Sequence, residues 1–280
     1  MRKMEQISEL KFESPSFFKR IKGMLGVDFY RLFHTPLFYI FLAIAAIIPA
    51  MILGTMGMEN PQTGEAAEPL YTNTWQIIAA DTPLYAVNSI AEYANMNMVF
   101  IFGGIMVSIF IGHDYKSGYV KQLFTTHAKK EDYMISKSLT CAFAMACMCI
   151  TYLLGAVGAG VFAQNSFKVN VGSLICAILG KMLMSLGWAS LYTFLNIIFR
   201  KYFGISIASS FFFGTGILII GVGALAGNSP LLNVFLYGSS VYACLSSNFW
   251  TVLVCLVVSV AWAGIYNVLG THILDKSDVY

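Results

Sequence analysis

Charged residues are scarce in this sequence. They make up 11% of its 280 residues, whereas an ordinary soluble domain has roughly 25%. Hydrophobic residues make up 58%. Because a chain with this balance has too few polar side chains to cover a folded surface with a solvated layer, a soluble globular protein is excluded and an integral membrane protein is predicted.

Patterns that carry chemistry are also missing. The chain has no Walker A motif, no H-E-x-x-H motif and no G-x-S-x-G motif. None of its four histidines has a metal-ligand neighbour at helical spacing, and its six cysteines lie mostly inside apolar runs. No basic patch is interleaved with exposed aromatic residues, which excludes a nucleic-acid partner. We therefore expect no catalytic residue, metal or cofactor in this chain, and expect any energy-coupled activity to be driven by another polypeptide.

What the chain has in abundance is apolar runs long enough to cross a bilayer as helices, at roughly 20 residues each. There are six such runs, at residues 36–57, 97–113, 138–163, 171–199, 203–226 and 249–272. The sequence therefore predicts an all-α membrane protein with one domain over residues 1–280. Its expected parts are a cytoplasmic tail (1–35), a six-span bundle (36–272) and a second cytoplasmic tail (273–280). Between the fifth and sixth spans, the segment after Gly227 is too apolar for a free loop and predicts short re-entrant helices.

The distribution of basic residues predicts the orientation. Fifteen of the seventeen Lys and Arg residues lie in 1–35, in 113–138, at 200–201 or at 276, whereas residues 58–96 carry acids and no base. Short loops rich in Lys and Arg stay in the cytoplasm. Both termini are therefore expected in the cytoplasm, and the 58–96 loop outside.

Residues 15–34 predict an amphipathic helix on the inner membrane surface. The apolar residues that recur at steps of three and four are Phe18, Ile21, Leu25, Phe29 and Leu32. Bases such as Arg31 fall largely elsewhere on the helical wheel, where they reach anionic headgroups. Pro36 fits a change of direction into the first span. The alternative is a plain cytosolic tail.

The fourth apolar run is long for one crossing and contains Lys181. If the helix begins near Val171, Lys181 lies about 15 Å deep. A charge near the midplane would be costly and would indicate a polar functional site, to which Asn196 could contribute. Alternatively, residues 167–180 form an interfacial or re-entrant segment, and Lys181 extends to the outer surface.

The charges are most concentrated in "IGHDYKSGYVKQLFTTHAKKEDYMISKS", residues 111–138. Gly118 predicts a helix end and a turn. Beyond it, Val120, Leu123 and Phe124 fall on one side of a short helix, while Lys121 falls elsewhere. Such an amphipathic element with exposed apolar residues favours docking in a groove on a partner. The alternative is a membrane-anchored turn whose bases only enforce topology.

The run Gly112 to Leu123, "GHDYKSGYVKQL", closely resembles the cytoplasmic segment of permease subunits of the type-2 ABC exporter family. Ser136 and Lys137 occupy the position of the family's later "SK". The stretch "DFYRLFHTPLFYI" (28–40) resembles the family's usual entry into the first span. The stretch "THILDKSDVY" (271–280) resembles the end of the family's last span, with its base and acid. His113 stands where the family commonly has an acid, and Tyr119 where it has threonine.

The resemblance implies a membrane half-transporter without catalytic residues of its own. ATP and Mg would bind a separate ABC ATPase subunit, and a second copy or a homologous permease would complete the pathway in the plasma membrane of a bacterial cell. The residues implied to contact the ATPase are Asp114, Tyr115, Gly118, Lys121, Leu123 and Phe124. Those of the connecting helix before the first span are Phe18, Ile21, Leu25, Phe29 and Arg31.

Within that family, a compact form with no large outer domain resembles the exporters of peptides, antimicrobial peptides or other amphiphiles, and the resemblance implies such a substrate. The alternative class is a non-transporting membrane scaffold or a channel subunit. An intramembrane enzyme would need paired polar residues that Lys181 and Asn196 alone do not supply.

Overall fold

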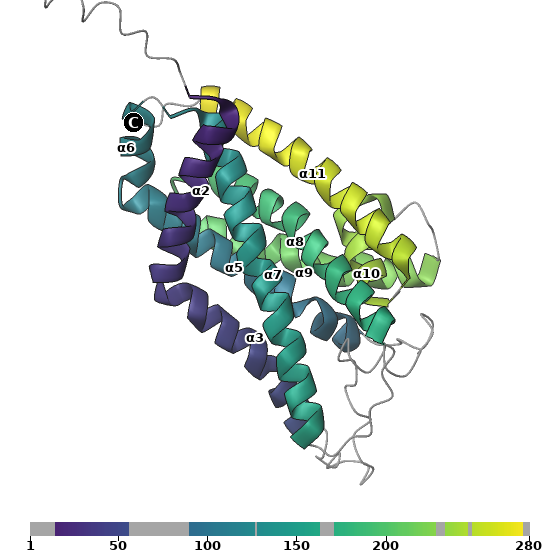
Figure 1. Cartoon of the computed structure of the whole chain (residues 1–280). Helices are drawn as coiled ribbons and strands as arrows, with labels where there is room; N and C mark the ends of the chain where they lie inside the picture. Colours follow the sequence, from purple (N-terminus) through teal and green to yellow (C-terminus); the bar gives the residue numbers. More distant parts are fainter. Residues whose placement is uncertain are drawn as a thin grey trace, which may run out of the picture.

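The computed structural model describes residues 15–55, 90–126, 128–162, 171–227, 233–245 and 248–276, which contain helices and short connections and no strand (Figure 1). The helices, in chain order, are α2 (Phe17–His34), α3 (Pro36–Thr55), α5 (Ile90–Lys116), α6 (Tyr119–Thr125), α7 (Lys130–Phe162), α8 (Val171–Ile198), α9 (Phe203–Gly227), α10 (Leu236–Leu245) and α11 (Phe249–Lys276). The prediction of an all-α protein is confirmed. The expected outer loop and the ends of both tails lie mostly outside the described residues.

Every predicted apolar run falls on a helix over its described residues. Four segments among the described residues are long and apolar enough to cross a membrane: Met98–Lys116, Lys130–Gly158, Leu174–Ile198 and Phe249–Lys276. A fifth crossing is added if the bent pair α2 and α3 counts as one span, and Phe203–Gly216 of α9 forms a further, shorter apolar segment. The structure thus has the apolar helices of a multi-pass membrane protein, with four or five of the six expected crossings.

The bend between α2 and α3 follows from one dipeptide. Thr35 is extended, with φ −97° and ψ 125°, and α3 begins at Pro36. A residue before proline disfavours the helical region, whereas proline itself fits the first position of a helix. The two helices therefore meet at 65°, which confirms the change of direction expected at Pro36.

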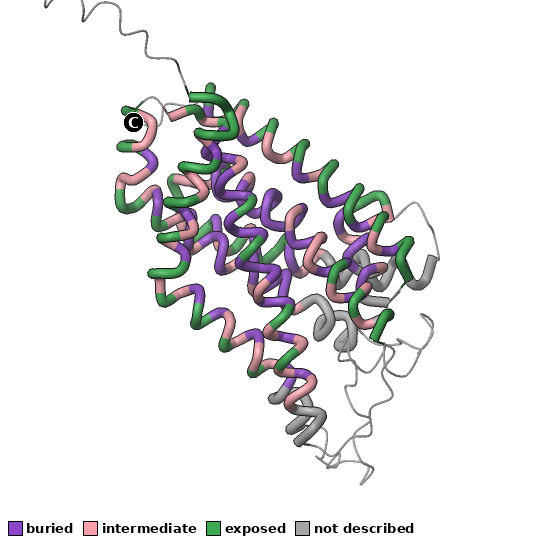
Figure 2. The backbone as a smooth tube through the Cα atoms, in the orientation of Figure 1, coloured by how far each residue is buried: buried purple, intermediate pink, exposed green. Residues whose placement is uncertain are grey.

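Helix α8 is central to the packing and contacts α11, α7, α5 and α10. Figure 2 shows buried residues concentrated in α5, α7 and α8, while exposed residues recur along the whole of α11. At the centre, Trp188 stacks on Phe100 with ring centroids 5.9 Å apart and meets Tyr237 edge-on at 5.1 Å. Its indole Nε1 donates a hydrogen bond to Ser240 Oγ on α10 at 2.6 Å. The short helix α10 lies in the segment predicted to be re-entrant, and its fully buried contacts fix it against the bundle.

Gly118 separates α5 from α6 and has a φ of +74°. The turn expected at this position is confirmed, and it requires the left-handed backbone that glycine adopts without cost. It directs α6 away from the axis of α5, at the end of the molecule where α11 ends and α7 begins (Figure 1).

Replacing Gly118 with alanine is expected to destabilise the α5–α6 turn by about 1–2 kcal/mol, because a Cβ is unfavourable in left-handed backbone. An added Cβ would meet no atom within 4 Å, so the loss would come from backbone conformation alone. Gly118→Asn should lose less, since asparagine tolerates this region. Thermal unfolding of the purified full chain measures the effect. Gly204→Ala, at a helical glycine with equally open surroundings, is the control and should not be destabilised. Equal behaviour of the two alanine variants would contradict the prediction.

Candidate functional site

Four charged side chains from three helices meet near the α5–α6 turn. They are Asp28 and Arg31 on α2, Asp114 on α5 and Lys137 on α7, and they are called the ion cluster below. Lys137 Nζ lies 2.5 Å from Asp28 Oδ1 and 2.7 Å from Asp114 Oδ2. The Arg31 guanidinium pairs with the Asp114 carboxylate and lies 4.0 Å from Asp28 Oδ1. The two acids and two bases balance to zero net charge.

The ion cluster is removed from solvent. The side chains of Asp28, Asp114 and Lys137 are 0% exposed, and that of Arg31 is 23% exposed. Ser136 Oγ donates a hydrogen bond to Asp28 Oδ2 at 2.7 Å. Taking a charge out of water costs several kcal/mol, so each member of the cluster depends on its partners. Loss of one member leaves the others buried and unbalanced.

Aromatic rings form the walls of the ion cluster and connect it to α6. The Arg31 guanidinium lies 4.1 Å from the centre of the Tyr119 ring, and Lys137 Nζ lies 4.8 Å from the centre of the Phe110 ring. Both distances suit a cation–π interaction. Because Tyr119 is the first residue of α6, the ion cluster joins four elements: α2, α5, α6 and α7.

The environment of the ion cluster shifts the pKa of its member Arg31 and of the adjoining Tyr119. Burial raises the pKa of Tyr119, and the nearby Asp28 carboxylate raises it further, against the lowering effect of Lys137 and Arg31. Burial alone would lower the pKa of Arg31, but its hydrogen bond and charge interaction with Asp114 raise it above its ordinary value. Tyr119 therefore stays neutral and Arg31 stays charged at physiological pH.

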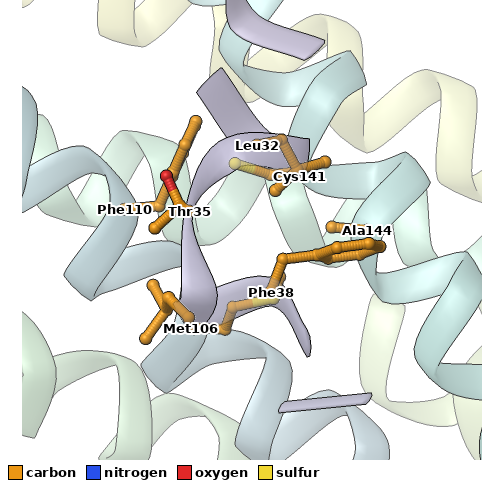
Figure 3. Close-up of a pocket in the computed structure, with 8 residues that line it drawn as sticks. Leu32, Thr35, Phe38, Met106, Phe110, Cys141 and Ala144 are labelled. Carbon is orange, nitrogen blue, oxygen red and sulfur yellow. The ribbon is translucent and has the colours of Figure 1, made fainter. Parts of the chain in front are cut away.

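Below the ion cluster, on the bundle side, lies an apolar layer. Figure 3 shows Leu32, Thr35 and Phe38 at the α2–α3 bend facing Met106 and Phe110 of α5 and Cys141 and Ala144 of α7. The hollow between these side chains is too narrow for a water molecule. Phe110 lies four residues before Asp114, Cys141 lies four after Lys137, and Leu32 directly follows Arg31. On the bundle side, the ion cluster is thus bordered by dry apolar packing.

The apolar side of α6 faces this chain rather than solvent. Val120 is 1% exposed, and Leu123 and Phe124 are half-buried beside Tyr133 of α7 and Leu274 of α11. Phe124 meets the Tyr133 ring edge-on, with centroids 5.7 Å apart. The expectation of exposed apolar residues on α6 is therefore wrong for Val120 and only half met for the other two, because the turn at Gly118 folds α6 against the ends of α7, α8 and α11.

The residues expected to contact an ATPase are thus distributed over three environments. Asp114 is inside the ion cluster, where no partner can reach its side chain in this conformation. Tyr115, Leu123 and Phe124 are half-buried, and Gly118 forms the turn. Lys121 is exposed on the outer side of α6, next to the exposed Gln122. Contact with an ATPase stays a prediction for these residues, and Lys121 is the best placed.

The amphipathic helix predicted over residues 15–34 is present as α2 and packs against α7, while its position on the membrane surface stays a prediction. Of its expected apolar residues, Phe18 is 82% exposed, Ile21 is buried, and Leu25 and Phe29 are half-buried. In addition to the ion cluster, an ion pair joins α2 to the start of α7: Arg20 Nε lies 2.7 Å from Asp132 Oδ2.

Sequence reasoning missed Asp28, Lys137 and Asp132 as site residues. A signal for Asp28 was present, because Asp28 lies four residues before Leu32 and seven after Ile21, on the apolar face of the helix. An acid on that face requires a buried basic partner, and the structure supplies Lys137.

The two polar residues expected inside the membrane do not form one site. Lys181 and Asn196 lie fifteen positions apart on the same helix, about 22 Å along its axis. Lys181 is 7% exposed, and its Nζ lies 5.9 Å from the centre of the Tyr152 ring. Because α8 is continuous over Val171–Ile198, the alternative of a separate segment ending at residue 180 is wrong for the described residues. Lys181 packs against this chain, and its depth in the membrane, at the midplane or at the outer surface, stays a prediction.

Comparison with known proteins adds no family or relative to these observations: no protein-family model matches the chain, and no curated protein matches it. The class therefore follows from the fold and the site. The chain has the helices of a multi-pass membrane protein, and one end of its bundle carries a buried ion cluster that joins α2, the short helix α6 and the long helices α5 and α7.

Proposed function

We propose that this chain is the membrane-spanning subunit of an ATP-driven exporter of the type-2 ABC class. It would cross the membrane six times with both termini in the cytoplasm, and α10 would dip back into the outer leaflet. A second copy or a homologous permease would complete the pathway, and a separate ABC ATPase would bind ATP and Mg. The substrate we propose is a peptide, an antimicrobial peptide or another amphiphile.

The observation that carries this proposal is the shared anchoring of α6 and α2. Tyr119 places the start of α6 against Arg31, and Arg31 and Asp28 place α2 against Asp114 and Lys137. A subunit driven from outside needs an element that receives a displacement and a rigid connection to the spans. Helix α6 offers the first, and the ion cluster offers the second.

The energetics of the ion cluster support a mechanical role. A buried ion pair adds little net stability compared with apolar residues of the same size, whereas breaking it by removing a partner costs about 3–5 kcal/mol. Pulling α2, α5 or α7 away from the others would separate Lys137 from a carboxylate in a region closed to solvent. The three helices should therefore move as one body when α6 is pushed. A passive scaffold has no need of such a connection.

The exposed side of α6 is the surface on which we expect the ATPase. Lys121→Glu reverses the charge of the exposed base on that side, and like-charge contacts across an interface cost several kcal/mol. The variant is expected to bind the ATPase subunit at least tenfold more weakly than the unaltered chain. The measurement is co-purification and titration after co-expression with the neighbouring genes, which are expected to encode the ATP-binding subunit.

Lys276→Glu is the matched control, because Lys276 is an exposed base at the end of α11 and lies outside α6. It should leave the complex unchanged. If both variants bound the ATPase subunit equally weakly, the loss would follow from the net charge of the chain and would not locate the contact on α6. If the unaltered chain, expressed with its neighbouring genes, retains no ATP-binding subunit, the exporter proposal fails and a scaffold or channel subunit takes its place.

A further inference from the structure

A cavity of about 240 Å³ lies at the end of the bundle that carries the α5–α6 turn, beside the ion cluster and outside it. It is formed where α5 ends, α8 ends and α9 begins. The polar side chains that line it include Lys116 of α5, Asn196 of α8, Arg200 and Lys201 of the α8–α9 turn, and Ser206 of α9. The cavity is smaller than the roughly 300–1,000 Å³ of a drug-sized binding site, so it suits a headgroup rather than a large molecule.

The cavity is strongly basic. Three of its lining residues carry positive charge, and none of the described residues that line it is acidic. Lys116 is held at the rim by Phe203, whose ring centre lies 4.2 Å from Lys116 Nζ. Bases that serve only to fix membrane orientation extend separately into water, whereas these three line the same cavity. A cavity lined by several bases favours the binding of a phosphate group.

The inner wall adds a buried polar atom. Asn196 is 2% exposed, and its Nδ2 donates hydrogen bonds to Ser108 Oγ at 3.0 Å and to the Tyr192 carbonyl at 2.8 Å. Because a carbonyl only accepts, the atom facing Tyr192 must be the amide nitrogen. Asn196 Oδ1 is then a buried acceptor, and it has no hydrogen-bond partner among the described residues. Because Asn196 Oδ1 is fully enclosed by protein, the charged groups that the cavity offers to a ligand are those of the three bases.

The position of the cavity indicates where the phosphate comes from. The apolar segments of α5 and α8 end at Lys116 and Ile198, and that of α9 begins at Phe203. The cavity therefore lies at the depth where apolar helices give way to polar residues, which is the depth of lipid headgroups.

We propose that this cavity binds the phosphate of an anionic lipid from the leaflet at this end of the bundle. Lys116, Arg200 and Lys201 neutralise the phosphodiester of a lipid such as phosphatidylglycerol. The site is independent of the exporter function proposed above, since a scaffold or channel with this fold would bind the same lipid.

The test uses the full chain in a zwitterionic detergent. It is titrated with phosphatidylglycerol, with phosphatidylcholine of the same acyl chains and with inorganic phosphate, and binding is read by native mass spectrometry and by the thermal unfolding midpoint. Arg200→Gln combined with Lys201→Gln removes two lining charges, each worth about 1 kcal/mol near an anionic surface, so phosphatidylglycerol should bind about thirty-fold more weakly. The control, Lys129→Gln combined with Lys276→Gln, removes two exposed charges that do not line the cavity and should leave the affinity within threefold.

If the double variant does not fold, Lys116→Gln changes an exposed side chain and is expected to weaken binding about fivefold. Equal losses in the cavity and control variants would overturn the proposal, as would equal affinity for phosphatidylcholine and phosphatidylglycerol. If inorganic phosphate binds as tightly as phosphatidylglycerol and the cavity variant loses both, the phosphate site stands and its lipid source is overturned.

Discussion

Replacement of Lys137 by methionine is expected to destabilise the protein by about 3–5 kcal/mol, more than a hundredfold in the ratio of folded to unfolded chains. Methionine fills a similar volume but leaves the carboxylates of Asp28 and Asp114 buried with Arg31 as their remaining base. Thermal unfolding of the purified chain and its abundance in the membrane measure the loss.

A double variant separates the charge effect from the packing effect. Asp28→Asn combined with Lys137→Met removes one acid and one base, so the ion cluster keeps the neutral pair of Arg31 and Asp114. Because the uncompensated charge is gone, this variant should recover at least half of the stability lost in Lys137→Met alone. A double variant less stable than the single one would contradict the assignment of the loss to unbalanced buried charge.

The second large effect is expected at Gly155, where α7 passes against α3. A Cβ added at Gly155 would lie 2.1 Å from the Ala46 carbonyl oxygen and 2.8 Å from the Ala46 carbonyl carbon. These are backbone atoms and cannot rotate away, so the two helices must move apart. Gly155→Ala is therefore expected to cost about 3 kcal/mol, the upper end of ordinary overpacking. The thermal unfolding midpoint of the purified chain measures this cost.

Gly158 on the same helix provides the control for Gly155. An added Cβ at Gly158 would meet no atom within 4 Å. Alanine also favours a helix by about 1 kcal/mol relative to glycine, so Gly158→Ala should be neutral or stabilising. If both alanine variants are stabilised alike, the close approach of α3 and α7 is not part of the folded protein.

The ion cluster changes how the charged segment 111–138, called the hairpin below, is interpreted. The sequence motif places Asp114 on a surface for a partner, whereas the structure places it inside, paired with Lys137 and Arg31. The hairpin therefore has an inner side that holds the chain together and an outer side, with Lys121, that is open to a partner. Variants of Asp114 would affect folding and any partner contact at once, so the outer side is where partner contact is best tested.

The sequence by itself determined the features that depend on near neighbours in the chain. Apolar runs of about 20 residues predict helices wherever they occur, and each of the six falls on a helix over the residues that the structure describes. The bend at Pro36 and the turn at Gly118 follow from backbone restrictions of single residues, and both are present. The amphipathic repeat before Pro36 correctly predicts α2.

Only the tertiary structure decided which polar residues meet. Asp28 and Lys137 are 109 positions apart, and Arg31 and Asp114 are 83 positions apart. Helical periodicity states which face of a helix a residue occupies, but the partner of that face depends on how the helices pack. For the same reason the sequence left Lys181 and Asn196 as one possible polar site, whereas a continuous α8 keeps them about 22 Å apart. Side chains within a helical turn are related by local geometry, while a buried charge is balanced by whichever helix the fold brings beside it.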